Sequence, residues 1–520
     1  MKTVHVAIEG GQSFCARPGE RLSNLLKAAG VYLSEPCGGV GRCGKCKVLV
    51  LRGKAGVTEA DRRFFDEKEL AQGCRLACTL RVEDDLLLRL SAPGEDAFDV
   101  LTADAARGNA AADASFGLAI DIGTTTLAAA LVDRNTGEIV ASACGVNHQR
   151  AYGADVIARI AAANDGRGAA LQNCIRQDLN ALIGQLLSGG GFAPGQIARA
   201  AVSANTTMGH LLMGYPCEGL GAYPFTPHRL DAVSDKAAGM FGEETLLRCP
   251  VTLLPGISAF VGGDIAAGLL ACGVYEQEKP VLLLDLGTNG EMAVGNRERI
   301  LVTSTAAGPA FEGGNISCGI GSIPGAICNV KITGGAAKVT TIGDAPARGL
   351  CGTGVIEAMR ELLVNGLVDE SGLMAEEYGE AGFVLAKTQE GEPLPFTQRD
   401  VREIQLAKSA VRAGAETLLL RYGISCDEVA AVYVAGGFGT RLDIAKAVDI
   451  GLLPEKLRGK VRAVGNTSLR GAIDFLTKTA APGQLAGLIA VSKEVALAMD
   501  QDFNERYLEY MTFERSEREG

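Results

Sequence analysis

Three cysteines lie close together in a glycine-rich segment near the N-terminus. They are Cys37, Cys43 and Cys46, and a fourth thiolate is available from Cys74 or Cys78. A [2Fe-2S] cluster is held by four thiolates, and glycines between them allow backbone N–H groups to approach its sulfurs. These residue types and spacings predict a [2Fe-2S] centre and therefore one-electron transfer.

A zinc ribbon is the alternative use of these thiols, with Cys43, Cys46, Cys74 and Cys78 as ligands. Two cysteine pairs about 15 to 20 residues apart are its usual signature. The interval is longer here, and zinc would leave Cys37 and its glycines without a role. The iron–sulfur interpretation therefore accounts for more of the residues.

Two aspartate-led turns indicate a second chemistry. Asp121-Ile-Gly-Thr-Thr-Thr and Asp285-Leu-Gly-Thr-Asn-Gly-Glu each follow an apolar strand. A carboxylate at a strand end can lie near Mg²⁺, while the amides and hydroxyls of the next turn donate to phosphate oxygens. One such turn is ordinary turn chemistry. Two facing copies would clamp a triphosphate from both sides.

A glycine turn after a third strand would complete a nucleotide site. The sequence Val432-Tyr-Val-Ala-Gly-Gly-Phe-Gly-Thr enters a predicted helix near 442–448, and Gly436 and Gly437 leave room for a purine ring against the backbone. The alternative is the strand-to-helix turn of any α/β fold.

The elements that position these turns repeat along the chain. Three-stranded antiparallel meanders are predicted from Phe116 and from Val281, which indicates an internal duplication. Predicted helices follow at 156–163, 171–187, 355–363 and 405–421. In the N-terminal module, strands are predicted at 4–8, 14–16, 47–51 and 86–90, with a helix at 21–29.

The predicted organisation has five parts. They are a ferredoxin-like domain at 1–91, a flexible linker at 92–115, lobes at 116–276 and 277–484, and a C-terminal helix and tail at 485–520. The helix is expected over 486–499 and a solvated tail over 505–520. The segment 308–319 is glycine-rich and is expected to be either a partner-facing or a nucleotide-closing loop.

Composition limits the classes of partner. The 520 residues carry a net charge of −11 and no dense basic stripe, which disfavours nucleic acid. No stretch approaches the roughly 20 apolar residues that span a bilayer. We expect a cytoplasmic protein whose 15 cysteines serve as ligands or buried residues rather than disulfides.

The cysteine loop resembles that of the adrenodoxin-like ferredoxins. Its C-x5-C-x2-C spacing differs by one residue from the plant-type pattern. In the ferredoxins that it resembles, the fourth ligand follows Arg-Leu-Gly or Arg-Leu-Ala. The resemblance therefore implies that Cys78, after Arg75-Leu76-Ala77, is the fourth ligand and that Cys74 is not.

The remaining motifs resemble the superfamily of acetate kinase, sugar kinases, Hsp70 and actin. With the ferredoxin module, Ser203-Ala-Asn-Thr-Thr-Met-Gly-His-Leu-Leu and Gly349-Leu-Cys-Gly-Thr-Gly, the whole chain is similar to the reductive activators of corrinoid proteins. The implied fold is a multidomain α+β and α/β protein. It combines a β-grasp [2Fe-2S] ferredoxin domain, a linker and a duplicated RNase H-like ATPase of the actin and Hsp70 type.

The resemblance implies roles for individual residues. Asp121 and Asp285 would orient Mg²⁺, Gly436 and Gly437 would bind adenosine, and either Glu291 or Asp264 would polarise the attacking water. Asn205, Thr206 and Thr207 would contact nucleotide or, as we favour, cap a helix. The residues expected to hold the phosphates of ATP are Gly123, Thr124, Thr125, Thr126, Gly287, Thr288 and Asn289.

The implied function is ATP-dependent reduction of a corrinoid protein from Co(II) to Co(I) in a methyltransferase system. The electron would pass from the [2Fe-2S] cluster, the primary donor is unidentified, and a homodimer is left open. The alternatives are a redox-sensing nucleotide-binding regulator, an ATP-dependent activator of another low-potential metalloenzyme, and a plain sugar or acetate kinase.

Overall fold

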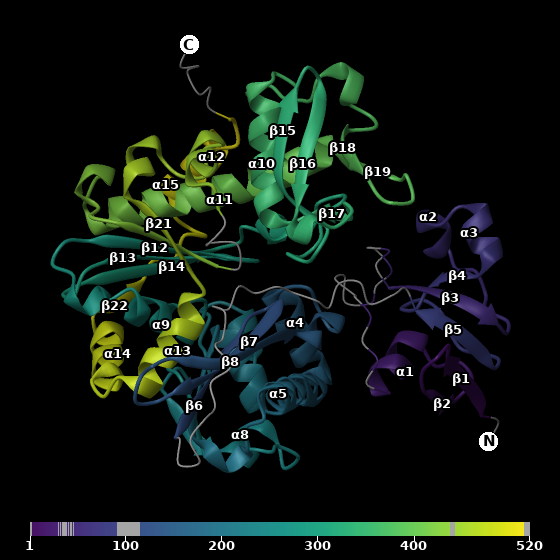
Figure 1. Ribbon diagram of the computed structural model, residues 1–520, viewed down its shortest axis with the longest axis horizontal. Helices are drawn as coiled ribbons and strands as arrows, with labels where there is room; N and C mark the ends of the chain where they lie inside the picture. The colour runs from purple at the N-terminus through teal and green to yellow at the C-terminus, as the bar shows by residue number, and fades with distance from the viewer. Residues whose placement is uncertain are drawn as a thin grey trace. The chain divides into compact units, whose positions relative to one another are not determined.

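The chain divides into two compact units (Figure 1). The first comprises Met1–Asp96, Val146–Leu179 and His210–His228, and the second comprises Ala97–Gly145, Asn180–Gly209 and Arg229–Gly520. Among the helices of the described residues, none has the length and apolar character needed to cross a bilayer. This computed structural model describes residues 3–29, 31, 33, 39, 41, 44, 46–90, 115–436 and 442–513.

The N-terminal part of the first unit is a β-grasp fold, as predicted. Its strand order is β2-β1-β5-β3-β4, with β1 parallel to β5 and the other neighbours antiparallel. In β1 the apolar Val4 and Val6 are buried while His5 between them is exposed, as a half-buried strand requires. The elements are β1 (Val4–Ile8), β2 (Ser13–Ala16), α1 (Leu22–Ala28), β3 (Lys47–Arg52), α2 (Asp61–Phe64), α3 (Glu67–Gln72), β4 (Cys74–Leu76) and β5 (Leu86–Leu90).

The other segments of the first unit are mainly helical. They contain α4 (Val156–Ala162), the first half of α5 (Gly168–Gly190), the second half of α6 (Thr206–Met213) and α7 (Glu218–Gly221). The helices predicted at 156–163 and 171–187 are therefore confirmed within a few residues.

The second unit contains two six-stranded sheets that repeat one topology over five of their strands. The first has the order β10-β11-β9-β6-β7-β8 and the second β21-β20-β12-β13-β14-β22. In each sheet a three-stranded antiparallel meander continues into strands parallel to its first strand, so the predicted duplication is confirmed. The strands are β6 (Phe116–Ile122), β7 (Thr126–Asp133), β8 (Ile139–Val146), β9 (Ile197–Ala204), β10 (Val233–Lys236), β11 (Pro250–Leu253), β12 (Val281–Leu286), β13 (Gly290–Gly295), β14 (Ile300–Thr305), β20 (Val432–Ala435), β21 (Val461–Gly465) and β22 (Ser492–Glu494).

An insertion follows the second meander and was not predicted as a separate element. A sheet of order β16-β15-β17 packs against α10, and a β18-β19 hairpin precedes α11. The predicted helices at 355–363 and 405–421 lie within α10 and α11. The elements are β15 (Ala326–Thr333), β16 (Ala336–Thr341), β17 (Gly349–Leu350), α10 (Gly352–Val364), β18 (Phe383–Lys387), β19 (Pro393–Phe396) and α11 (Gln398–Tyr422).

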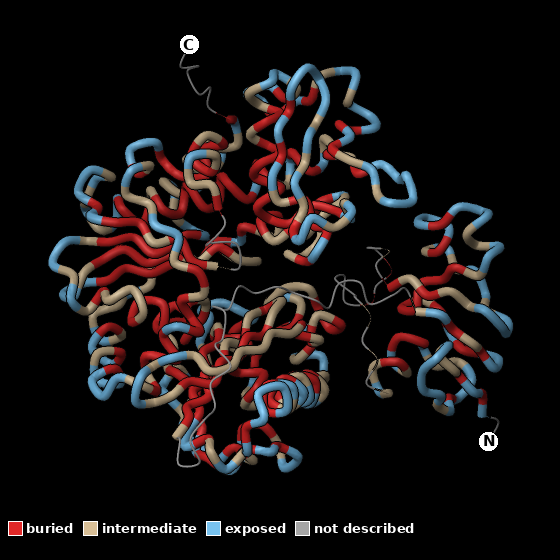
Figure 2. Tube along the Cα trace, viewed as in Figure 1, coloured by how far each residue is buried: buried red, intermediate tan, exposed pale blue. Residues whose placement is uncertain are grey.

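Two helices join the sheets of the second unit. The helices α9 (Gly263–Ala271) and α13 (Thr467–Thr477) pack together, and an apolar core that includes Ile265, Leu269, Leu283 and Ile473 surrounds them. Figure 2 shows the central strands of the second sheet as buried. The remaining helices of this unit are α8 (Ala237–Phe241), α12 (Ile444–Asp449), α14 (Ala481–Ala490) and α15 (Gln501–Glu509).

The C-terminal prediction was wrong. The expected helix at 486–499 is replaced by α14, β22 and a connecting segment, and α15 extends into the start of the expected tail at 505–520, of which residues 514–520 lie outside the described residues. The buried Lys408 ammonium donates to the carbonyls of Tyr510 and Thr512 at 2.6 and 2.7 Å, and Phe513 is buried. Tertiary contacts with α11 thus order a segment whose charges had indicated solvent.

The close crossing of α9 and α13 depends on glycine. A Cβ at Gly471 would lie 2.1 Å from the backbone oxygen of Ala267. We expect Gly471→Ala to destabilise the protein by about 1–3 kcal/mol, the usual cost of overpacking. Gly483→Ala on α14, where a Cβ meets nothing within 4 Å, is the control and should be neutral or stabilising. Urea denaturation measures both variants, and equal stability for them would contradict this account of the crossing.

Candidate functional site

The two predicted aspartates occupy equivalent positions in the duplicated sheets. Asp121 in β6 and Asp285 in β12 are the partly exposed residues of otherwise buried strands. Asp121 pairs with Ser203 of β9, and Asp285 pairs with Ala435 of β20. Because neighbouring parallel strands end at the same edge, each aspartate lies beside the loop that leaves the next strand.

Each aspartate is followed by a tight turn that contains glycine. The Gly123 N–H donates to the Thr126 carbonyl at 2.9 Å, and the Gly287 N–H donates to the Asn289 carbonyl at 3.0 Å. A Cβ at Gly123 would lie 2.8 Å from the Thr126 oxygen. The first turn therefore requires glycine at this position.

The two turns face each other. The Thr125 and Thr288 hydroxyl oxygens are 3.3 Å apart, although 163 positions separate them in the sequence. The structure thus brings together two of the threonines that were predicted to hold phosphates. The meeting of these hydroxyls supports a single site built from both halves of the duplication.

Glu312 joins both turns and was not predicted as a site residue. Its carboxylate accepts from the Thr288 hydroxyl at 2.9 Å and from the Thr125 hydroxyl at 3.5 Å. Burial raises the pKa of Glu312, and these two hydrogen bonds oppose that shift. The residue belongs to the segment 308–319, for which the sequence left two roles open.

Asp121 is held by residues near the start of α13. The Asn466 amide donates to Asp121 at 2.7 Å and the Ser468 hydroxyl donates at 2.6 Å. Sequence analysis missed both. Their place in the duplication could have indicated them. The helix α9 follows β11 and carries Asp264 in its first turn, and α13 follows β21 in the same way in the second half.

Four carboxylates near the turns, each of them only partly exposed, have raised pKa values. Burial is the main cause, and it raises the pKa of Asp264 to about 7 and that of Asp285 to about 8. The Asp121 carboxylate adds to both shifts, and Asp264 and Asp285 add to the rise in the pKa of Glu291, which burial dominates. Negative charge is therefore costly here until a cation arrives.

The carboxylates and the hydroxyls of the two turns fit a hydrated magnesium ion that is also bound by phosphate. Within the described residues, no three His, Cys, Asp or Glu side chains form a group that would enclose a metal ion. Mg²⁺ commonly uses one or two carboxylates, several waters and substrate phosphates. Asp121 and Asp285 beside two hydroxyl-bearing turns supply that chemistry.

Asn205 has the capping role that was favoured for it. Its carbonyl oxygen accepts from the Met208 N–H at 2.9 Å, which caps α6, and its amide donates to the Thr124 hydroxyl at 3.0 Å. The favoured capping role is confirmed for Asn205, while Thr206 donates to the Ser258 carbonyl at 2.7 Å. Asn205 thereby connects α6 to the first phosphate turn.

Gly436 requires glycine for a structural reason. Its φ is 114°, and a Cβ on this residue would lie 2.3 Å from the backbone oxygen of Leu286, at the end of β12. Gly437, predicted with it to bind adenosine, lies outside the described residues. This close approach places the predicted adenosine motif next to the strand that carries Asp285.

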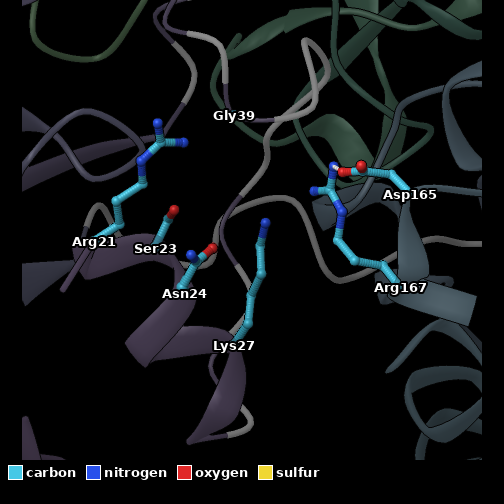
Figure 3. A pocket seen from close by; sticks show the side chains of 7 residues that line it. All are labelled: Arg21, Ser23, Asn24, Lys27, Gly39, Asp165 and Arg167. Carbon is cyan, nitrogen blue, oxygen red and sulfur yellow. Dashed lines mark hydrogen bonds and ion pairs between the residues drawn. The ribbon is translucent and has the colours of Figure 1, made fainter. Parts of the chain in front are cut away.

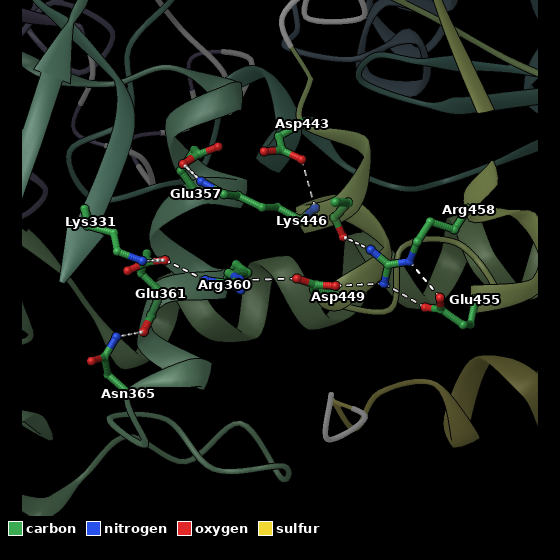
Figure 4. A network of polar contacts seen from close by, with 11 residues as sticks. Lys331, Glu357, Arg360, Glu361, Asn365, Asp443, Lys446, Asp449, Glu455 and Arg458 are labelled. Atoms are coloured by element: carbon green, nitrogen blue, oxygen red, sulfur yellow. Dashed lines mark hydrogen bonds and ion pairs between the residues drawn. The ribbon is translucent and has the colours of Figure 1, made fainter. Parts of the chain in front are cut away.

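Ion pairs fix the helix that follows this motif. In Figure 4 Lys446 of α12 pairs with the buried Glu357 of α10, and Asp449 accepts from Arg360 at 3.2 Å and from Arg458 at 2.8 Å. Burial makes such pairs costly to break from one side. The helices α10 and α12 are therefore held together.

The described part of the cysteine loop fits a cluster cradle. Cys46 and Cys78 are both buried, and the Ala77 N–H donates to the Cys46 carbonyl at 2.9 Å. Gly41, with φ of 74°, leaves a Cβ only 2.9 Å from Thr79, next to Cys78. Cys37 and Cys43, the other two predicted ligands, lie outside the described residues.

A polar cavity of about 320 Å³ lies in the same unit (Figure 3). Arg21 and Lys27 line it from the ferredoxin-like fold, together with Gly39 of the cysteine loop. Asp165 and Arg167 line the other side and form an ion pair at 3.2 Å. The lining is basic overall.

Comparison with known proteins matches this architecture. Residues 6–83 match a 2Fe-2S iron-sulfur cluster binding domain, residues 116–277 the RACo middle region, and residues 279–519 the C-terminal domain of RACo, the ASKHA domain. The corrinoid activation enzyme RamQ of Eubacterium limosum is 32% identical over 418 residues, which are 76% of this chain and 69% of RamQ. This chain belongs to the family of reductive activators of corrinoid proteins.

A second relative and a solved structure show how much of the chain is similar to known activators. A [Co(II) methylated amine-specific corrinoid protein] reductase of Methanosarcina barkeri is 31% identical over 305 residues. These residues are 54% of this activator-family chain and 54% of the reductase. The solved structure of a reductive activator for corrinoid, iron-sulfur protein has a TM-score of 0.72 and 28% identity over 98% of both chains. The activator fold therefore extends over nearly the whole chain.

The buried carboxylates predict that the nucleotide-free activator loses stability as the pH rises. An ordinary aspartate has a pKa of 3.8, whereas Asp264 and Asp285 have values of about 7 and about 8. Between about pH 4 and pH 8 the folded state thus binds more protons than the unfolded state, and the free energy of unfolding falls with pH. Urea denaturation without Mg²⁺ at pH 5 and pH 8 measures the difference.

Asp285→Asn should reduce the change in the free energy of unfolding between pH 5 and pH 8. Asp427→Asn removes an exposed carboxylate and should leave this change as it is in the wild type. A free energy of unfolding that rises between pH 5 and pH 8 in the wild type would contradict the assignment.

The fourth cluster ligand can be tested by a matched pair of variants. Both Cys74 and Cys78 are buried, and Cys74 pairs with Leu49 within the sheet. We expect Cys78→Ser to lose the [2Fe-2S] EPR signal of the dithionite-reduced protein and Cys74→Ser to retain it. The reverse result would assign the ligand to Cys74.

Proposed function

We propose that the protein uses ATP to return one electron to the inactive Co(II) form of a corrinoid protein and so restores Co(I). The observation that carries the proposal is the meeting of Thr125 and Thr288 beside Asp121 and Asp285, in a chain that also has a β-grasp ferredoxin fold. A kinase would need the first feature alone, and a ferredoxin the second alone.

The electron path begins at the cysteine loop. Cys37, Cys43, Cys46 and Cys78 would hold a [2Fe-2S] cluster that, when bound, gives up one electron as cobalt gains one. Plant-type clusters lie near about −400 mV, and each further ~59 mV uphill costs about 1.4 kcal/mol for one electron. An energy source is therefore useful when the cobalt couple lies lower.

The nucleotide would bind between the two turns. Asp121 and Asp285 would orient Mg²⁺, Thr125 and Thr288 would donate to phosphates, and the loop after Gly436 would receive adenosine. Asn466 and Ser468 keep the Asp121 carboxylate in place. Differential binding of ATP to two arrangements of the lobes can then change how the partner holds its cobalt.

Asp264 is the better candidate to activate water. A general base works best when its pKa lies near the operating pH. The pKa of Asp264 is about 7, which meets this condition, and burial together with Asp264 and Asp285 raises the pKa of Glu291 well above its ordinary value of 4.5. The Glu291 carboxylate is also engaged within the sheet, because it accepts from the Ser304 hydroxyl at 3.4 Å.

The names of the relatives support the substrate class. The relative from Eubacterium limosum is a corrinoid activation enzyme, and the one from Methanosarcina barkeri is a reductase of a Co(II) corrinoid protein. We infer a corrinoid protein of a methyltransferase system as the partner and a separate reductant as the primary electron donor.

Two variants test the function from its two ends. With a purified Co(II) corrinoid protein, dithionite and MgATP under anaerobic conditions, absorbance spectroscopy follows Co(I). We expect Cys46→Ser to abolish Co(I) formation but retain ATP binding. Asp285→Ala should keep the cluster and slow the ATP-dependent reaction on the order of 100-fold, as loss of a preorganised electrostatic group does.

Cys328→Ser, in the insertion and outside the cysteine loop, is the control and should behave as wild type. Co(I) formation by Cys46→Ser at the wild-type rate would contradict the electron path. ATP binding without any cobalt reduction by the wild type would instead favour a redox-sensing regulator.

A further inference from the structure

Glu312 lies where the two phosphate turns meet. Its Oε2 atom accepts from the hydroxyls of Thr288 and Thr125, and a Cβ built on Gly287 would lie 3.3 Å from its Oε1. The carboxylate thus uses the donors of both turns at once. It connects two halves of the chain that are otherwise far apart in the sequence.

A carboxylate and a phosphate cannot share these donors. Both are anions that accept hydrogen bonds from hydroxyls, and like charges close together repel. If the turns bind the phosphates of ATP, as the proposed function requires, Glu312 must leave when the phosphates arrive. The contact of Glu312 with these hydroxyls and the binding of phosphate to them are then mutually exclusive.

We propose that Glu312 is a latch that holds the segment 309–319 on the empty phosphate turns and that nucleotide phosphates release. The Glu312 latch couples the occupancy of the site to the position of this segment. It also joins the two roles left open for 308–319, because the segment would close the empty site and become available to a partner once ATP is bound.

The backbone around Glu312 allows release without unfolding the core. Glu312 ends a single 3-10 turn, Pro309–Glu312, in which Ala310 and Phe311 are buried. Gly313 follows with φ of 80°, and Gly308 precedes the turn with φ of 76°. Glycine at both ends permits large changes in φ and ψ, so the backbone at Glu312 can change while Phe311 and Ile316 stay anchored in the core.

The far end of the segment contacts α11. The Ser317 N–H and hydroxyl donate to Asp400 at 2.7 and 2.9 Å, and the Asn315 amide donates to Glu403 at 3.3 Å. Asn315 and Ser317 are exposed. Helix α11 packs against β13 and β14, the strands that follow the second phosphate turn. The exposed surface formed by Asn315 and Ser317 is therefore connected to the site through Glu312 and through α11. Release of Glu312 would change this surface.

Hydrogen exchange followed by mass spectrometry tests the latch in the full-length protein. Peptides covering 309–319 are compared in the wild type, Glu312→Ala and Glu312→Gln, each without nucleotide and with MgATP. Glu403→Gln is the matched control, because it alters a carboxylate that contacts the same segment but not the phosphate turns. A fluorescent ATP analogue measures affinity in parallel.

The latch predicts faster exchange in 309–319 on adding MgATP to the wild type. Glu312→Ala should show the fast exchange without nucleotide and should bind the analogue roughly tenfold more tightly, because no competing contact has to be broken. Glu312→Gln keeps an acceptor and should lie between them. Glu403→Gln should have wild-type affinity.

Two results would overturn the latch. One is unchanged exchange of 309–319 in nucleotide-free Glu312→Ala. The other is unchanged affinity with loss of ATP hydrolysis, which would make Glu312 a catalytic residue instead. Failure of the proposed function is distinguishable, because a wild type that reduces no cobalt yet shows the predicted exchange pattern would support the latch and contradict only the electron transfer.

Discussion

The burial of several carboxylates at the meeting point of two glycine-threonine turns is the constraint on which this structure depends. Asp121, Asp264, Asp285, Glu291 and Glu312 all have raised pKa values, and burial is the main cause for each. Such groups are costly unless they are protonated, hydrogen-bonded or neutralised by a cation. A fold that gathers them retains them for chemistry rather than for stability.

The duplicated fold is what brings these groups together. Each half ends a buried strand with aspartate, turns through a glycine and presents a threonine hydroxyl to the other half. The helices α9 and α13 cross where Gly471 meets the backbone of Ala267, and their first turns supply Asp264 and Ser468. The close crossing thus places side chains from both halves at one site.

Local patterns were enough to predict the repeated parts of this arrangement. Alternating apolar residues and glycine turns located both meanders, the β-grasp strands and the two aspartates, because these signals lie within a few residues of one another. Asn466 and Ser468 were missed because they contact Asp121 across 345 and 347 positions in the sequence, and Glu312 because it joins Thr288, 24 positions away, to Thr125, 187 positions away. No local pattern distinguishes them from ordinary caps and turns.

The C-terminus shows the opposite error. Its charged residues indicated a solvated tail, but Tyr507 and Phe513 pack against the core of the second sheet, and carbonyls of the last described residues accept from Lys408. The helix α15 is amphipathic, and its partner α11 ends 79 positions before it begins. Tertiary packing therefore overrode a correct reading of local polarity.

The central claim is that the carboxylates and the two turns form one magnesium–nucleotide site. Calorimetric titration with MgATP at pH 7, in two buffers of different ionisation enthalpy, tests it directly. The account predicts one nucleotide per chain and a net release of protons, because a cation lowers the raised pKa values of Asp264 and Asp285. Binding without proton release, or with equal strength in EDTA, would contradict it.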